Sequence, residues 1–477
     1  MLMHVENLGL TYPGTGKRMF NEVSLSINEG EKVLLLGPSG CGKSTLLHVL
    51  SGVIPRSVDV PMRAAKLEVS DSYGYVFQDP DSQFCMPFVD EELAFVLENL
   101  RISREEMKEE IQRLLSEVGL ELEDPHTKIS TLSGGMKQKL AIASALALRP
   151  DTLFLDEPTS LLDEESTKSV WKTIKEIGLD KTLVIVEHKL DHVLDMIDRI
   201  ILFDADGTIR ADGAKEWILN QYKGTLKNFG VWYPGAWEEY LSSRQMIESP
   251  SFGPVIVRME DFKGYIQKKE KIHLPYAVIR KGEWIAVTGR NGAGKSTLLH
   301  SLMKFNHTSG TYELNGVQMK GKKISQECAF VFQNPELQFV THSVFDEVAY
   351  GYRLKDLSEE SIERKVYELL QRFNLRSCKG QHPYSLSVGQ KRRLSVAASI
   401  VPSKEILLLD EPTFGQDAHN TFELLEMLLE LQSEGVTILM VTHDIRITQH
   451  YATRIWTVEE GRVVQDADVE ASRSEAL

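Results

Sequence analysis

The sequence predicts two successive α/β domains, each built on a mainly parallel β-sheet. A glycine-rich loop that follows an apolar stretch and precedes a helical stretch occurs twice, at residues 37–45 and 289–297. Apolar β-type stretches such as 182–186 alternate with helical stretches such as 105–117, whose apolar residues recur at helical spacing. In a sheet of this kind, ligands bind at the carboxyl ends of the strands.

Both glycine-rich loops have the pattern G-x-x-x-x-G-K-S/T, which is typical of a phosphate-binding P-loop. Glycines let the backbone wrap around phosphates, and the following helix adds the positive end of its dipole. We expect Lys43 and Lys295 to bind the β- and γ-phosphates of a nucleotide. The first predicted set of nucleotide-binding residues is Gly37, Pro38, Ser39, Gly40, Cys41, Gly42, Lys43, Ser44 and Thr45. The second set is Gly289, Arg290, Asn291, Gly292, Ala293, Gly294, Lys295, Ser296 and Thr297.

Length and composition limit the kind of protein. A chain of 477 residues can form two domains of about 200 residues each. Apolar and charged fractions of 42% and 26% are those of a globular protein. The formal net charge of −15 argues against a chain that wraps around nucleic acid. No signal peptide is evident and no apolar stretch reaches the roughly 18–20 residues of a membrane helix, so another chain would supply any membrane part.

The four cysteines do not have the spacing of a metal or redox site, so we expect reduced thiols. They are Cys41, Cys85, Cys328 and Cys378. Cys41 lies inside the first P-loop, where we expect it to fill a small-residue position. The alternative is a thiol whose modification blocks nucleotide binding.

The order of sequence signals in the first half returns in the second half. Lys43 corresponds to Lys295, 252 residues later, and His188 corresponds to His443, 255 residues later. The displacement stays between 252 and 255 residues, which indicates duplication of one domain. We predict a first domain over 1–223, a linker rich in Pro, Gly and Ser over 224–254, a second domain over 255–466 and a flexible tail over 467–477. Aromatic residues at 231–237 suggest that part of the linker packs on a domain.

Each half contains an apolar strand that ends in two adjacent carboxylates. Asp156 and Asp410 fit the Mg²⁺-supporting role beside a P-loop, together with Ser44 and Ser296. Glu157 and Glu411 follow them and are candidates to polarise an attacking water. The alternative, an acid pair that only caps a helix, is disfavoured because both halves contain the pair.

A Ser-Gly-Gly segment opens the predicted helix at 137–148, and a similar segment lies at 386–390. Such a helix start presents a hydroxyl and free N–H groups to an anion. Because a P-loop already surrounds one side of the nucleotide, we expect this second device to serve the nucleotide of the other copy. An ordinary serine N-cap is the alternative interpretation.

Five motifs follow in the same order in each half: the P-loop, a glutamine loop (Gln78, Gln333), a signature segment (132–138, 386–392), the acidic strand (153–159, 407–413) and a histidine strand (His188, His443). Over nearly the whole chain, these motifs in this order resemble the ATP-binding cassette (ABC) ATPases. The resemblance implies that each domain adds an antiparallel β subdomain and a helical subdomain, that ATP and Mg²⁺ are the cofactors, and that the two domains pair head to tail. It implies a first composite site formed by Lys43, Ser44, Gln78, Asp156, Glu157, His188, Ser387, Gly389 and Gln390. The second would contain Lys295, Ser296, Gln333, Asp410, Glu411, His443, Ser133, Gly134 and Gly135.

The resemblance also assigns roles. Catalytic roles are expected for Gln78, Glu157, His188, Gln333, Glu411 and His443, and the two glutamines would also bind the metal. Tyr12 would stack on adenine in the first domain, and Tyr265 or Ile266 in the second. The loop that follows each acidic strand, the D-loop, would carry an acid that senses the opposite site, Asp163 in the first domain and Asp417 in the second.

Two residues depart from the family pattern. Val388 stands at a signature position that is usually glycine, and valine would cost about 1 kcal/mol if that position needs positive φ. Met136 replaces the usual signature glutamine. We expect both sites to hydrolyse ATP, and the two departures leave open whether their rates are equal.

The segments 78–84 and 333–339, with the pattern Gln-(Asp/Asn)-Pro-x-x-Gln-Phe, resemble those of energy-coupling-factor (ECF) and cobalt-type importer ATPases. That subgroup drives uptake of vitamins, such as thiamine precursors, or of metal ions. The resemblance implies an integral membrane coupling subunit, a separate substrate-binding membrane subunit, and a peripheral location on the cytoplasmic face of a bacterial or archaeal membrane. Candidate contacts for the coupling subunit are Pro80, Gln83, Phe84, Pro335, Gln338 and Phe339, and core packing is the alternative for the phenylalanines.

Other functions stay open. A tandem sugar-importer ATPase commonly has one degraded site, whereas both sites here retain their glutamate and histidine. A translation-associated ABC protein would carry a long charged linker or an iron–sulfur domain, and a DNA-maintenance protein would carry a long coiled coil. The short aromatic linker, the scattered cysteines and the short gaps between motifs tell against both of these classes.

Overall fold

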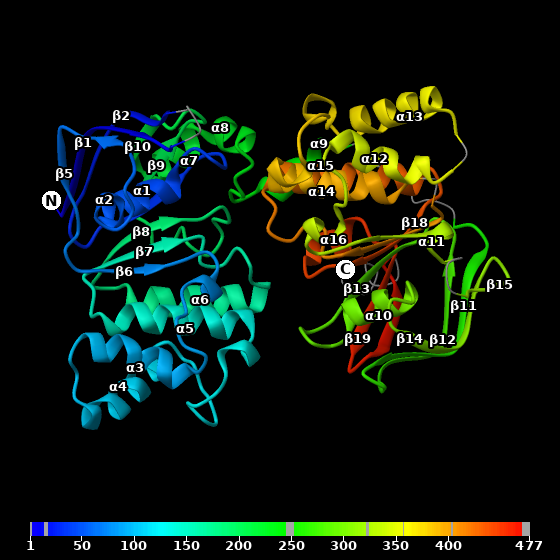
Figure 1. Ribbon diagram of the computed structural model, residues 1–477, viewed down its shortest axis with the longest axis horizontal. Helices are drawn as coiled ribbons and strands as arrows, with labels where there is room; N and C mark the ends of the chain where they lie inside the picture. The colour runs from blue at the N-terminus through cyan, green and yellow to red at the C-terminus, as the bar shows by residue number, and fades with distance from the viewer. Residues whose placement is uncertain are drawn as a thin grey trace. The chain divides into compact units, whose positions relative to one another are not determined.

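The computed structural model describes residues 2–13, 18–244, 252–320, 324–355, 357–401 and 404–469 (Figure 1). The chain divides into two compact units, one formed mainly by residues up to Arg244 and the other mainly by residues after it. Each unit contains a six-stranded sheet and a four-stranded sheet. The predicted α/β class and the tandem arrangement are therefore confirmed.

The six-stranded sheet of the first unit has the order β10-β9-β3-β8-β7-β6. All neighbouring strands are parallel except β9 and β10. The strands β7 and β8 are buried along their whole length, which explains their continuous apolar sequences. The bounds are β3 (Lys32–Leu36), β6 (Tyr73–Val76), β7 (Thr152–Asp156), β8 (Thr182–Val186), β9 (Arg199–Phe203) and β10 (Ile209–Ala214).

An antiparallel sheet and a helical layer complete the first unit, as the resemblance implied. The sheet contains β1 (Met3–Thr11), β2 (Arg18–Ile27), β4 (Met62–Arg63) and β5 (Lys66–Glu68). The helices are α1 (Lys43–Leu50), α2 (Val53–Arg56), α3 (Val89–Asn99), α4 (Arg104–Glu117), α5 (Gly134–Ala147), α6 (Glu164–Ile177), α7 (Lys215–Gln221), α8 (Lys223–Asn228) and α9 (Ala236–Ser243). The predicted helix at 105–117 is α4, which begins at a capping box of Ser103 and Glu106.

The second unit repeats this plan. Its six-stranded sheet has the order β16-β17-β18-β13-β19-β20, with bounds β13 (Trp284–Thr288), β16 (Cys328–Val331), β17 (Ile406–Asp410), β18 (Thr437–Val441), β19 (Arg454–Glu459) and β20 (Arg462–Asp468). Its antiparallel sheet contains β11 (Val255–Ile266), β12 (Lys269–Arg280), β14 (His307–Leu314) and β15 (Val317–Gln318). The helices are α10 (Lys295–Leu302), α11 (Ile324–Glu327), α12 (Val344–Arg353), α13 (Glu359–Arg372), α14 (Val388–Ser399), α15 (Ala418–Ser433) and α16 (Ile445–His450).

The stretch interpreted as a linker, 224–254, is folded over much of its length. It contains most of α8 and all of α9, and Trp232, Tyr233 and Trp237 are buried. Gly235 takes a left-handed conformation as the N-cap of α9, so this glycine starts a helix instead of marking a flexible connection. The first compact unit accordingly extends to Arg244, and residues 245–251 lie outside the described part.

The predicted flexible tail, 467–477, also begins too early. Ala467 and Asp468 pair with β19 as the last residues of β20, and Val469 is buried. Small polar residues misled the prediction because an edge strand tolerates them on its exposed face. Residues 470–477 lie outside the described part. Within the ranges that the structure describes, no helix has both the length and the apolar character needed to cross a membrane.

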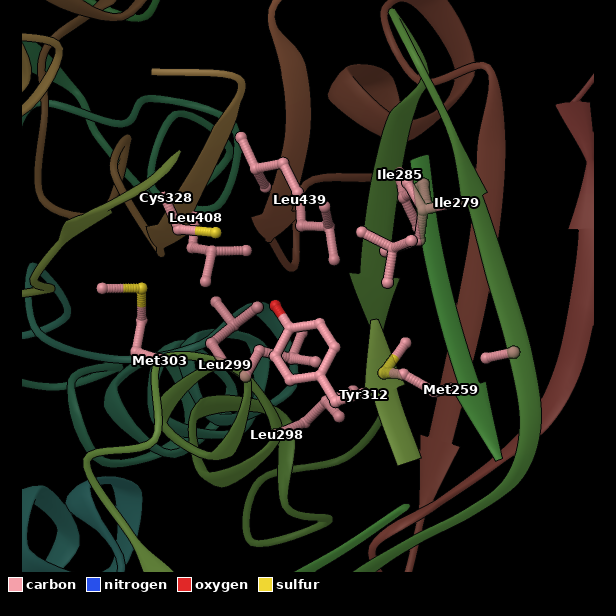
Figure 2. Close-up of a cluster of buried hydrophobic side chains, with 14 of the residues drawn as sticks. Met259, Ile279, Ile285, Leu298, Leu299, Met303, Tyr312, Cys328, Leu408 and Leu439 are labelled. Carbon is pink, nitrogen blue, oxygen red and sulfur yellow. The ribbon is translucent and has the colours of Figure 1, made fainter. Parts of the chain in front are cut away.

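The core of the second unit brings together its two sheets and α10 (Figure 2). Met259 and Tyr312 come from the antiparallel sheet, Leu299 from α10, and Leu408 and Leu439 from the parallel sheet. This core carries the helix that follows the second P-loop, so its packing fixes the position of that loop.

We expect Leu408→Ala to lower the free energy of unfolding of the second unit by about 2–5 kcal/mol, because a buried leucine leaves a cavity when truncated. Val317→Ala, at a residue that is 48% exposed, is the matched control. Urea unfolding followed by circular dichroism measures the difference. Equal midpoints for the two variants would contradict the expectation.

Candidate functional site

The first P-loop joins β3 to α1. Gly40 and Gly42 have φ angles of 79° and 104°, values that glycine adopts without steric cost. The Lys43 side chain is buried, and its Nζ donates hydrogen bonds to the carbonyl oxygens of Gly37 (2.8 Å) and Pro38 (3.1 Å). The ammonium group therefore lies inside the curve of the loop, beside the first turn of α1.

The second P-loop, between β13 and α10, has the same form. Gly294 also has a φ of 104°, and Lys295 Nζ donates to the carbonyl oxygens of Gly289 (2.9 Å) and Arg290 (3.0 Å). Loop, lysine and helix start thus occur once in each unit. Both units present the lysine and helix end that bind phosphate groups in P-loop proteins.

Cys41 of the first P-loop is buried, and burial raises the pKa of its thiol although the charge of Lys43 opposes the shift. The thiol is protonated and shielded, which is unfavourable for reaction with thiol reagents. The interpretation as a small packed residue is therefore the better one. All four cysteines are free thiols, as expected.

A serine and an aspartate meet beside each P-loop lysine. Ser44 Oγ donates to Asp156 Oδ1 (2.8 Å), and Ser296 Oγ donates to Asp410 Oδ1 (2.9 Å). Burial raises the pKa of both aspartates, and the hydrogen bond from the serine opposes the shift. Hydroxyl and carboxylate oxygens are the hard ligands that Mg²⁺ prefers, so these residues fit a Mg²⁺ ion.

The first catalytic candidates converge on Glu157. Gln78 Nε2 donates to Glu157 Oε2 (3.1 Å), and His188 Nε2 lies 3.0 Å from Glu157 Oε1. Burial raises the pKa of Glu157, but the hydrogen bond and charge interaction with His188 and the charge of Lys43 lower it below its ordinary value overall. The carboxylate therefore stays ionised and can accept a hydrogen bond from water.

The same three residue types converge in the second unit. Gln333 Nε2 donates to Glu411 Oε2 (3.1 Å), and His443 Nε2 lies 3.1 Å from Glu411 Oε1. Glu157 and Glu411 both have left-handed backbones, with φ of 47° and 45°. Such a conformation costs about 1–3 kcal/mol in a non-glycine residue and is retained at functional sites. In this conformation each glutamate contacts the glutamine and the histidine of its own unit.

The two signature segments both begin helices, but with different caps. Ser133 Oγ accepts from the Met136 N–H (3.3 Å) at the start of α5. Ser387 Oγ accepts from the Gln390 N–H (3.3 Å), and Gln390 Oε1 in turn accepts from the Ser387 N–H (3.0 Å). Met136 cannot make the return bond, so the first signature has a weaker cap.

Glycine is required at one signature position and not at the other. A Cβ atom at Gly389 would lie 2.0 Å from Asn420 Oδ1, and one at Gly135 would lie 2.8 Å from Ser166 Oγ. Val388 is 60% exposed as the first residue of α14, without positive φ. The strain considered for Val388 therefore does not arise. Gly134, which corresponds to Val388, begins α5.

Backbone register decides between Tyr265 and Ile266. Asn7 in β1 and Asp261 in β11 both have left-handed backbones, and the residues that follow them have the same pattern of burial. Tyr12 lies five positions after Asn7, and Ile266 lies five positions after Asp261. Ile266, which is 40% exposed, is thus the structural counterpart of Tyr12. Tyr265 instead shares a hydrogen bond with Ser309 (3.2 Å).

Each glutamine loop is hydrogen-bonded to the signature helix of its unit by a glutamine that was predicted to contact the coupling subunit. Gln83 Nε2 donates to the Ala141 carbonyl (2.9 Å), and Gln338 Nε2 to the Ser395 carbonyl (2.9 Å). Pro80, Pro335 and Phe339 are buried, so the core-packing alternative fits Phe339, whereas Phe84 is half-buried.

Arg392 is a supporting residue of the second glutamine loop that was not predicted from the sequence. Its buried guanidinium donates to the carbonyl oxygens of Phe332 and Gln333, both at 2.7 Å. Burial lowers the pKa of Arg392 to about 10, while the charges of Asp410 and Glu411 oppose the shift. The sequence feature that could have pointed to Arg392 is its place two positions after Gln390, the signature glutamine. Gln138 stands at this position in the first unit and donates to the Phe77 carbonyl (3.3 Å).

The D-loop acid of the first unit has a local role. Asp163 accepts a hydrogen bond from the Ser166 N–H (2.7 Å) and caps α6. This contact fixes the turn between the acidic strand and α6. The predicted role of Asp163 and Asp417 in sensing the opposite site stays a prediction.

A family model described as ABC transporter matches residues 20–160 and 277–414, one match in each unit. The chain belongs to the ABC transporter family. As an ABC protein, it binds and hydrolyses ATP, and the predictions of the family and of this activity are confirmed.

Relatives of this ABC protein span almost its whole length. It is 38% identical to YkoD of Bacillus subtilis (strain 168), which has the provisional name HMP/thiamine import ATP-binding protein, over 96% of this chain and 90% of that protein. It is 33% identical to an ABC transporter ATP-binding protein, also provisionally named, of Methanosarcina mazei, over 98% of this chain and 88% of that protein. A solved structure, cbiO1 from Clostridium perfringens, part of the ABC transporter complex cbiONQ, is 30% identical with a TM-score of 0.43, over 46% of this chain and 92% of that chain.

Proposed function

We propose that this ABC protein is the ATP-hydrolysing subunit of an importer whose membrane-spanning parts are separate chains. The observation that carries the proposal is the complete set of glutamine, glutamate and histidine around a P-loop in each unit. A tandem sugar importer with one degraded site fits this observation less well. YkoD, whose provisional name includes HMP/thiamine import, supports uptake of a vitamin precursor, and a metal ion is the second class of solute.

The residues of each unit would divide the reaction among them. The P-loop N–H groups and Lys43 hold the β- and γ-phosphates, while Ser44 and Asp156 hold Mg²⁺. When bound, Mg²⁺ neutralises charge on the phosphate oxygens. Glu157 accepts a hydrogen bond from the attacking water, and His188 fixes the glutamate. Lys295, Ser296, Asp410, Glu411 and His443 would act in the same way in the second unit.

We propose that the two units pair head to tail, so that each signature completes the P-loop site of the other unit. The caps of α5 and α14 support this pairing. Each helix is at least 12 residues long and begins at a serine N-cap, where several backbone N–H groups are available to an anion. ATP that binds only the joined state stabilises that state by mass action. Hydrolysis removes this stabilisation, and the resulting cycle would drive the membrane subunits.

The first unit offers a surface for a membrane partner beside its glutamine loop. A cavity of about 590 Å³ is lined by Gln83, Cys85 and Phe95, among others. Glu92 holds the loop at this cavity, since its Oε2 accepts from the N–H groups of Cys85 and Met86, both at 2.8 Å. Phe95 is 37% exposed, which leaves apolar area for a helix of a coupling subunit. Binding to such a subunit would hold the chain at the membrane, and we propose that it does so on the cytoplasmic face.

Affinity purification from membranes tests the proposal. The chain should be recovered with integral membrane proteins, and Phe95→Asp should lose them while the purified chain keeps its ATP hydrolysis within about twofold. Leu179→Asp, at an exposed residue elsewhere in the unit, is the matched control. Uptake of labelled thiamine precursor should require the chain. Recovery with ribosomes instead, or uptake of a sugar instead, would favour the alternatives.

A further inference from the structure

A buried carboxylate lies directly beside the candidate catalytic histidine of the first unit. Glu187 follows the last residue of β8, precedes His188, and is only 2% exposed. Its Oε1 accepts hydrogen bonds from the backbone N–H groups of His188 (3.0 Å) and Lys189 (3.4 Å). The side chain therefore holds the backbone of the histidine loop from inside the unit.

The second oxygen of Glu187 is also bound. Thr159 Oγ1 donates to Glu187 Oε2 (3.1 Å), and Trp171 Nε1 donates to Thr159 Oγ1 (3.2 Å). Both partners are buried. A carboxyl group is costly to bury unless it is hydrogen-bonded, so this chain of bonds offsets the cost. Burial raises the pKa of Glu187, and the charge of Glu157 adds to that effect.

The histidine loop is held from its other side by backbone. Trp232 N–H donates to the His188 carbonyl (3.0 Å), and the Leu190 N–H donates to the Trp232 carbonyl (3.1 Å). The N–H and the carbonyl of His188 are thus both fixed, one by Glu187 and one by Trp232. Because both peptide groups of His188 are held, its backbone cannot shift and carry the imidazole away from Glu157.

The second unit holds its histidine differently. Thr442 stands where Glu187 stands in the first unit, and Leu425 stands where Trp171 does. Thr442 Oγ1 accepts from the Asp444 N–H (3.1 Å), one residue beyond His443. The catalytic atoms are the same in both units, whereas the group that fixes the histidine loop is different.

We propose that Glu187 is a positioning residue, which fixes the backbone of His188 and so holds the imidazole against Glu157, and that hydrolysis at the first site depends on it in a way that has no counterpart at the second. This inference rests on the proposed catalytic roles of His188 and Glu157. A displacement of about 1 Å in a catalytic group can lower a rate about 100-fold, so loss of the two accepted hydrogen bonds should be visible in kcat.

Single-turnover ATP hydrolysis by the full chain tests the proposal, with the second site silenced by Glu411→Gln. In this background Glu187→Thr, which installs the residue of the second unit, should lower the rate about 10- to 100-fold with ATP affinity unchanged. Glu187→Gln should keep most of the rate, since its amide oxygen can still accept from the His188 N–H. The matched control is Glu105→Gln, at an exposed residue of α4, in the same Glu411→Gln background, where we expect a change within about threefold.

Three outcomes would overturn the proposal. One is a Glu187→Thr rate equal to that of its parent, while His188→Ala in the same background is inactive. Another is a Glu187→Gln rate as low as that of Glu187→Thr, at an unchanged thermal unfolding midpoint. The third is retention of the rate by His188→Ala. This result would also overturn the proposed catalytic role of His188, so it distinguishes failure of that role from failure of the positioning role of Glu187 alone.

Discussion

Replacing both glutamates, with Glu157→Gln and Glu411→Gln, should lower kcat for ATP hydrolysis by about 100- to 10,000-fold, because a positioned carboxylate contributes a factor of this size. ATP should still bind, since neither glutamate lies in a P-loop. Phosphate release measures the rate, and fluorescent nucleotide titration measures binding. Glu105→Gln, at an exposed residue of α4, is the matched control.

The single variants show whether the two sites work equally. Each glutamate accepts from a glutamine and lies close to a histidine, at distances that agree within 0.1 Å between units. We therefore expect each single variant to lower kcat. An unchanged rate for one of them would mean that this site only holds nucleotide.

Lys43→Ala should weaken ATP binding at the first site by about 10- to 100-fold, because a buried charged hydrogen-bond donor contributes about 1.5–3 kcal/mol. The Lys43 ammonium lies within the P-loop, and no other lysine of that loop can replace it. Lys295→Ala should have the same effect at the second site. Equilibrium titration with an ATP analogue measures both sites.

Lys172→Ala is the control for the lysine variants, since Lys172 is exposed on α6 and makes only a 4.0 Å ion pair with Glu176. Unchanged binding stoichiometry and affinity in Lys43→Ala would contradict the assignment of the first P-loop. A loss of both sites in either single variant would show that binding at one site requires the other.

Sequence reasoning predicted the fold and most of the candidate site because each motif is a short continuous segment. The P-loop, the acidic strand and the histidine strand each place their functional residues within a few positions of a strand end. Parallel strands then bring these ends to the same edge of the sheet. The contacts of Glu157 with Gln78 and His188 follow from this topology.

The supporting residues could not be predicted in the same way. Glu187 directly precedes His188 in the sequence, but its other support comes from Thr159, 28 residues earlier, and from the Trp171 indole, and the sequence does not show these contacts. The choice of Ile266 depends on aligning two left-handed residues, Asn7 in β1 and Asp261 in β11, and the backbone conformation of these residues is known only from the structure. The helix α9 was not predicted because Pro234 and Gly235 were interpreted as linker residues. In the structure Gly235 is the N-cap of this helix.

Glu187 supports the histidine loop of one unit, and Thr442 supports that of the other. This difference between the units has a consequence for the stoichiometry of the protein. A single polypeptide that carries both halves fixes their ratio at one to one. A machine assembled from two copies of one half would have to use identical supports at both sites. Fusion of the two halves removes this requirement. The support of each histidine loop, and with it the rate of ATP hydrolysis at that site, can then differ between the halves while the residues that contact the nucleotide stay the same.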